Sequence, residues 1–141
     1  MPSAGVETRI SEALNSWLAG LVLSPALPIA WPNDPFTPTS AFLQPSLLPA
    51  PTVAMAVPYA GPNEYVGVYQ VSVFYPAGQG MTAPAETASL VVARFRRGTA
   101  LSRSGIEVRI NNPPWLSPAL QEPGWYQIPV SVPYQAFVPN V

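Results

Sequence analysis

The stretch GVYQVSVFYP, residues 67–76, decides the fold of this chain. Aromatic and β-branched residues, which favour strands, fill most of it, and only Gln70 and Ser72 are polar. The alternation places apolar side chains on both faces, so it predicts a central strand over residues 65–75. Pro76 and the glycines that follow it end this strand.

An amphipathic helix is predicted ahead of this strand, over about residues 4–22. Apolar residues recur there at helical spacing with polar residues between them, and Pro25 marks a point that the helix cannot pass. Such a stripe is typical of a helix that packs on a sheet. The stripe consists of Ile10, Leu14, Trp17, Leu18 and Leu21.

A second helix is predicted after the central strand, over about residues 83–96. Thr82 or Ala83 can cap it, and its first turn holds a proline and a glutamate, which both suit that position. Gly98 is a typical stop residue, and cations in the last turn interact favourably with a helix C-terminus. This role explains the cluster of Arg94, Arg96 and Arg97 without any ligand.

Prolines dominate the region of residues 24–63. They arrive every few residues, which excludes a helix of ordinary length and leaves short strands and loops. We expect one strand near residues 28–31 and another near 41–48. Pro45 is compatible with the second strand only at a sheet edge or a bulge.

Further strands are predicted between residues 105 and 138. Residues 106–110 alternate apolar and charged side chains, and residues 126–134 repeat the alternation more strongly. Pro129 and Pro133 are four residues apart, so both missing N–H groups point to the same side of the strand. We therefore predict an edge strand that is protected against uncontrolled pairing.

These elements predict an α+β fold in which two helices pack on one mainly antiparallel (mixed) sheet. A helix, strands, a helix and further strands suit a two-layer arrangement that buries one face of each element. A chain of 141 residues fits one hydrophobic core, so we expect a single domain over residues 1–141.

Composition excludes most familiar kinds of active site. The chain has no cysteine and no histidine, and its seven carboxylates are scattered, so we expect no catalytic residue, no metal and no cofactor. Charged residues make up only 9% and the net charge is −1, which favours self-association over sequence-specific nucleic-acid binding. The apolar stretch of residues 17–23 is too short to span a membrane and follows acidic residues, so we expect neither a membrane helix nor a signal peptide.

Several stretches, taken in order along nearly the whole chain, resemble the tail terminator (tail completion) proteins of long-tailed bacteriophages and gene transfer agents. The resemblance rests on Trp31-Pro32-Asn33 with Pro35-Phe36, on residues 42–48, on residues 67–76, on Phe95-Arg96-Arg97-Gly98, and on residues 125–134.

This resemblance implies a virion protein that assembles as a homo-oligomer, a hexameric ring, on the tail tube protein at the head-proximal end of the tail. It implies that the other face of the ring receives the head–tail connector (head completion) protein, and that DNA passes through the ring. Assembly in the host cytoplasm is expected. Such a protein has a structural role and is not an enzyme.

A ring requires two different patches on each subunit. Candidate patches are loops that carry large apolar residues without strand or helix periodicity, since an exposed side chain of that size forgoes roughly 1.5–3 kcal/mol of burial. We predict that the loop with Met55, Val57 and Tyr59 docks the tube. The other candidates for a tube or ring interface are Trp115, Leu116 and Leu120, with Arg96, Arg97 and Arg103 as partners for acidic groups on a neighbouring ring or as helix caps.

Two alternatives stay open from the sequence. The first is a head-closure or connector ring subunit of the same virion. The second is a small ligand-binding module, for example for a sugar, in which Trp31, Trp115, Trp125 and the tyrosines form an aromatic surface beside Asn33 and Asp34.

Overall fold

The fold is α+β, with two helices and one open antiparallel sheet around one core. The structure is a computed structural model and describes residues 5–23, 26–32, 34–38, 40–50, 53–54, 62–78, 80–103 and 105–139. The helices are α1 (Val6–Ala19) and α2 (Thr82–Arg94). The strands are β1 (Phe42–Pro49), β2 (Val53–Ala54), β3 (Pro62–Pro76), β4 (Ala100–Arg103), β5 (Ile106–Arg109), β6 (Trp115–Leu116), β7 (Leu120–Glu122) and β8 (Trp125–Pro139).

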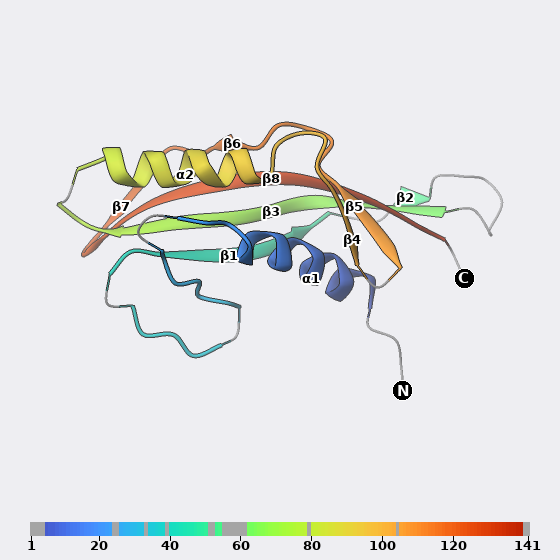
Figure 1. Cartoon of the computed structure of the whole chain (residues 1–141), viewed down its shortest axis with the longest axis horizontal. Helices are drawn as coiled ribbons and strands as arrows, with labels where there is room; N and C mark the ends of the chain where they lie inside the picture. Colours follow the sequence, from blue (N-terminus) through green and yellow to red (C-terminus); the bar gives the residue numbers. More distant parts are fainter. Residues whose placement is uncertain are drawn as a thin grey trace.

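The sheet is built on two long strands, β3 and β8, which pair antiparallel along their whole length and follow the long axis of the molecule (Figure 1). The strand order is β1-β3-β8-β5-β4, with β2 paired to β3, and with β6 and β7 paired to β8. The named strands all pair antiparallel, and a parallel bridge joins Ile29 to Leu43 of β1. The prediction of a central strand is confirmed, and it occupies β3.

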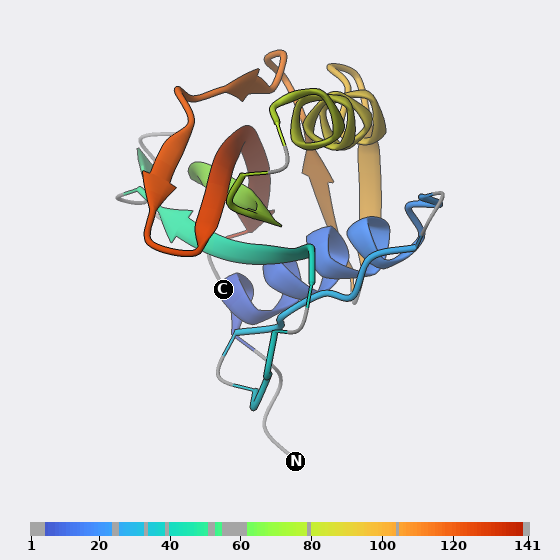
Figure 2. The same ribbon diagram turned by 90° about the vertical axis from the view of Figure 1, so that its left-hand side faces the viewer.

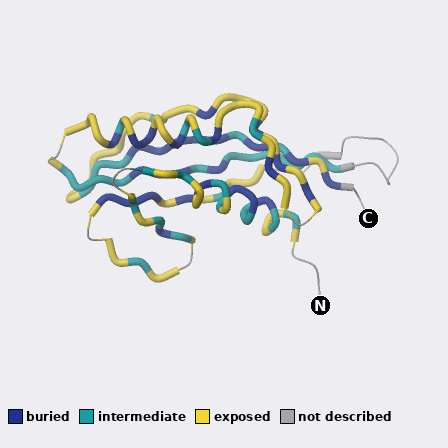
Figure 3. The backbone as a smooth tube through the Cα atoms, in the orientation of Figure 1, coloured by how far each residue is buried: buried dark blue, intermediate teal, exposed yellow. Residues whose placement is uncertain are grey.

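Alternation along β3 and β8 divides the sheet into a helix-facing side and an outer side. The helix-facing side chains of both strands are buried, as Tyr69, Val71 and Val130 illustrate. They share one core with the apolar stripes of α1 and α2; Figure 2 shows α2 above and α1 below, both on the side of the curled sheet away from β7. Burial is therefore concentrated between the helices and the two long strands, as the dark segments of Figure 3 show.

The prediction that the C-terminal strand lies at the sheet edge is wrong. β8 pairs with β3 on one side and with the short strands β5, β6 and β7 on the other. The carbonyl of Pro129 accepts a hydrogen bond from the N–H of Ser117 (2.9 Å), so Pro129 directs its missing donor toward β6. The prolines thus weaken one side of β8, and short, interrupted strands cover that side.

The edge position predicted for Pro45 is confirmed. β1 is the last strand at this edge of the sheet. On its outer side, the backbone N–H of Leu43 donates a hydrogen bond to the Pro28 carbonyl (3.0 Å), and the Leu43 carbonyl accepts one from the N–H of Ala30 (2.7 Å). Pro45 is two residues further on and therefore points its missing donor the same way. The strand expected near residues 28–31 is reduced to the bridge at Ile29.

Candidate interaction surfaces

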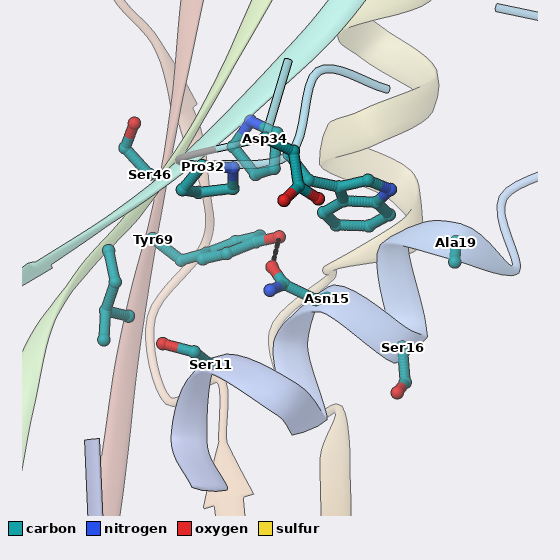
Figure 4. Close-up of a pocket in the computed structure, with 11 residues that line it drawn as sticks. Ser11, Asn15, Ser16, Ala19, Pro32, Asp34, Ser46 and Tyr69 are labelled. Atoms are coloured by element: carbon teal, nitrogen blue, oxygen red, sulfur yellow. Dashed lines mark hydrogen bonds between the residues drawn. The ribbon is translucent and has the colours of Figure 1, made fainter. Parts of the chain in front are cut away.

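An open pocket lies beside α1, between that helix, β1 and the segment that follows Ala30 (Figure 4). Its volume is about 650 Å³. The wall is mostly apolar, and polar groups come from α1 and from Asp34. The lining residues are Ser11, Asn15, Ser16, Ala19, Trp31, Pro32, Asp34, Pro45, Ser46, Leu47 and Tyr69.

Tyr69 joins the floor of this pocket to α1. Its side chain is buried, and its hydroxyl donates to Oδ1 of Asn15 at 2.6 Å. Burial raises the pKa of Tyr69 far above its ordinary value, so this hydroxyl stays protonated and keeps donating. Asp34 is exposed, and its carboxylate points into the pocket in Figure 4 without a partner among the described residues.

Arg94 and Trp17 connect the C-terminal ends of the two helices. The indole N–H of Trp17 donates to the Arg94 carbonyl (2.6 Å), and Nε of Arg94 donates to the Trp17 carbonyl (2.9 Å). The guanidinium also lies 3.6 Å from the centroid of the Trp17 ring. Arg94 lies in the last turn of its own helix, as the sequence predicted, and also caps α1. Residue spacing carries no signal of this contact between distant helices.

Three large apolar side chains of β6 and β7, called the assembly patch below, stay exposed: Trp115, Leu116 and Leu120. They are 49%, 45% and 48% exposed, and both strands pair with the same side of β8. The sequence predicted Trp115 and Leu116 as interface residues in a loop. The structure places them in a short strand and leaves them open to solvent, so their role as an interface stays a prediction.

The other predicted site residues lie in three places. Arg96 and Arg97 are exposed in the turn that joins α2 to β4. Arg103 ends β4 and pairs with Glu12 of α1 (3.5 Å). Met55, Val57 and Tyr59 fall outside the described residues.

The three tryptophans of the ligand-binding alternative do not form one surface. Trp31 lines the pocket beside α1 together with Asp34. Trp125 packs at the end of the sheet against Phe42 and Phe74, with ring centroids 5.3 and 6.3 Å away. Trp115 lies on β6. Of the tyrosines in that alternative, Tyr69 lines the pocket, and so does Asn15, which the sequence did not single out because it lies on a different element.

Metal-binding and membrane-spanning features were also sought in the described part of the chain. No cluster of three or more carboxylates with metal-binding geometry occurs among those residues. None of the helices described has the length and apolar character that a membrane crossing requires.

Comparison with known protein families identifies the chain. A profile of the family described as phage tail terminator protein matches residues 9–134, from inside α1 to inside β8. The chain belongs to the phage tail terminator family. None of the curated proteins compared with this terminator is similar enough to match.

Two solved structures share the fold of this terminator. One carries no functional name; it is 26% identical, covers 93% of this chain and 92% of its own, and superposes with a TM-score of 0.71. The other belongs to the virion of a native gene transfer agent (GTA) particle; it is 18% identical, covers 97% of this chain and 99% of its own, and has a TM-score of 0.59. The family match thus makes this chain a structural protein of phage tails, and the two solved structures show that it shares their fold.

Proposed function

We propose that this protein closes as a ring, a hexamer, on the head-proximal end of the tail tube and thereby ends tube polymerisation. The other face of the ring receives the head connector, and DNA passes through the opening. The family match over residues 9–134 is the observation that carries the proposal. Subunits of this kind act through contacts, with no catalytic step.

The exposed apolar side chains support a role in assembly. Trp115, Leu116 and Leu120 are each about half exposed on neighbouring short strands. Contact with another subunit buries such surface, and each Å² of apolar surface buried stabilises the contact by roughly 25 cal/mol. We assign this patch to ring or tube contacts, and we retain the loop with Met55, Val57 and Tyr59 as the predicted tube-docking element.

Deletion of the gene tests the proposed function. We expect particles without the protein to carry tails of uncontrolled length, measured by electron microscopy, and to lack attached heads. A plasmid copy of the wild-type gene should restore one uniform length. Tails of normal length in the deletion strain would contradict tube termination, and a ring bound to the portal side would favour a connector subunit instead.

Matched substitutions test the assembly patch. Trp115→Gln with Leu116→Gln should leave the purified protein folded, with unchanged circular dichroism, but should fail to complement the deletion. Leu48→Gln is the control, because Leu48 is 50% exposed on β1, which β3 and β8 separate from β6. Equal complementation by the two variants would remove the patch from the proposal.

A further inference from the structure

The arginines of this chain fall into a paired set and an unpaired set. The chain has six basic residues, all arginine and all within the described residues. Four of them make interactions inside the chain: Arg9, Arg94, Arg103 and Arg109. The other two, Arg96 and Arg97, are neighbours and have no side-chain partner in the described part of the molecule.

The turn that holds Arg96 and Arg97 is fixed on both sides. Phe95 is fully buried in the core. The hydroxyl of Thr99 donates to the Arg96 carbonyl (2.7 Å), and Gly98, at a φ of 97°, donates from its N–H to the carbonyl of Ile110 (2.8 Å). A fixed backbone presents both guanidinium groups to solvent at little entropic cost, as a preorganised binding element does.

The pocket beside α1 has the chemistry that receives a guanidinium. The Asp34 carboxylate is unpaired within the described chain, and the half-buried Trp31 forms part of the wall. An arginine pairs with carboxylates through two parallel N–H groups and stacks on aromatic faces. The volume of about 650 Å³ admits the side chain together with part of the turn that carries it.

We propose that the Arg96–Arg97 turn of one copy inserts into the pocket of the next copy, where a guanidinium pairs with Asp34 and stacks on Trp31. The occupant is a second copy of this chain because Arg96 and Arg97 are the two arginines whose side chains have no partner among the described residues. This contact rests on the proposed ring and supplies its subunit interface.

The positions of the two partners suit a head-to-tail contact. The pocket is lined by Ser11, Asn15 and Ala19, which lie on one flank of α1. The arginine turn shares a second hollow with Trp17, on another flank of the same helix, and with Leu21, just beyond its C-terminal end. One subunit thus carries donor and receiver on different sides, as a heterologous interface requires, and repetition of the contact closes a ring when the rotation allows it.

Cysteine cross-linking in particles tests the contact without background, since the chain has no cysteine. Particles are built with Asp34→Cys and Arg97→Cys in the same chain, and in a second set with Asp34→Cys and Arg96→Cys. A short bismaleimide is the reagent, because an arginine side chain holds the two backbones farther apart than a disulfide spans. We expect at least one pair to give a ladder of covalent oligomers, whereas each single variant gives none.

A control pair distinguishes contacts between copies from contacts within one. Glu12→Cys with Arg103→Cys joins residues that pair inside one chain, so cross-linking there should consume thiols without producing a ladder. Charge exchange gives a second readout: Asp34→Arg and Arg97→Asp should each lose complementation, and the double variant should regain it.

The results separate this contact from the proposed function. No ladder from either pair, combined with no rescue by charge exchange, in particles that contain the protein would overturn the contact and leave the terminator role intact. Absence of the wild-type protein from purified tails would refute the terminator role and the contact with it.

Discussion

Replacing Arg94 with methionine should lower the free energy of unfolding by about 2–3 kcal/mol, because Arg94 joins the ends of both helices. A hydrogen bond from a charged donor contributes about 1.5–3 kcal/mol, and a partly exposed cation–π contact about 0.5–1 kcal/mol. Arg94 makes one of each with Trp17. Methionine keeps the apolar stem of the side chain and removes both interactions.

The assay is urea unfolding followed by tryptophan fluorescence, at a protein concentration where light scattering shows a monomer. At 141 residues, each kcal/mol lowers Tm by roughly 3–4 °C, so thermal unfolding should shift by about 6–12 °C. Arg96→Met is the control, since that side chain is exposed and has no partner among the described residues. We expect the control to stay within about 0.5 kcal/mol of wild type.

Gly20 provides an independent check of the same contact. A Cβ on Gly20 would lie against Nη2 of Arg94, and the backbone there is helical (φ −81°), so alanine is otherwise compatible. Gly20→Ala should therefore destabilise the wild type but add little in the Arg94→Met background. Equal stability of the Arg94→Met and Arg96→Met variants, or additive effects in this cycle, would refute the reasoning.

Three further predictions concern the core. Gly67→Ala should lower the free energy of unfolding by about 1–3 kcal/mol, because the new Cβ would lie 2.5 Å from the backbone of β1. Gly5→Ala is the control, since a Cβ there has room, and equal losses in the two variants would contradict this reasoning. Tyr69→Phe should cost about 1–2 kcal/mol through loss of its bond to Asn15, and an unchanged urea midpoint would show that this bond contributes nothing. Burial, and to a lesser extent the nearby Glu7, raises the pKa of Tyr134 from 10 to about 12. The stability that the protonated Tyr134 hydroxyl contributes is complete below pH 10 and is lost as the pH rises toward 12. Tyr134→Phe should therefore reduce the loss of stability at alkaline pH.

Local patterns predicted the elements with strong periodicity and misjudged those whose partners are distant in sequence. The helix predicted over about 4–22 occurs as α1, shorter at both ends, and the helix predicted over about 83–96 occurs as α2, which starts at residue 82 and ends at 94. The strand predicted over 65–75 occurs as β3. β4 was missed because its four residues have one buried side chain, Leu101, and therefore no visible alternation. β8 was taken for an edge strand because two prolines cannot reveal that several short strands cover one side of it.

The pocket beside α1 was accessible to sequence reasoning only in part. Trp31 and Asp34 are three residues apart and were noted together as a possible polar and aromatic set. Asn15 and Tyr69 are 54 residues apart, and only the packing of α1 on β3 brings the amide to the hydroxyl. The charge argument for Arg96 and Arg97 likewise needs the structure, because pairing of the other four arginines is not visible in the sequence.

The edges of the sheet bear on the proposed role in ending tube polymerisation. An unpaired strand edge is a template for further strands, and prolines and short strands blunt it. At one edge Pro45 turns its missing donor outward, and at the other β4 is four residues long and its Arg103 pairs with Glu12 of α1. Among the described residues neither edge offers a long row of free donors, so the proposed ring would form through side-chain contacts. Contacts of that kind close after a fixed number of subunits when their geometry allows.

Replacing Pro45 with valine would restore an outward donor to β1. The purified variant should then form larger species in light scattering than the wild type at equal concentration. An unchanged size distribution would show that β1 is protected by its neighbours rather than by proline.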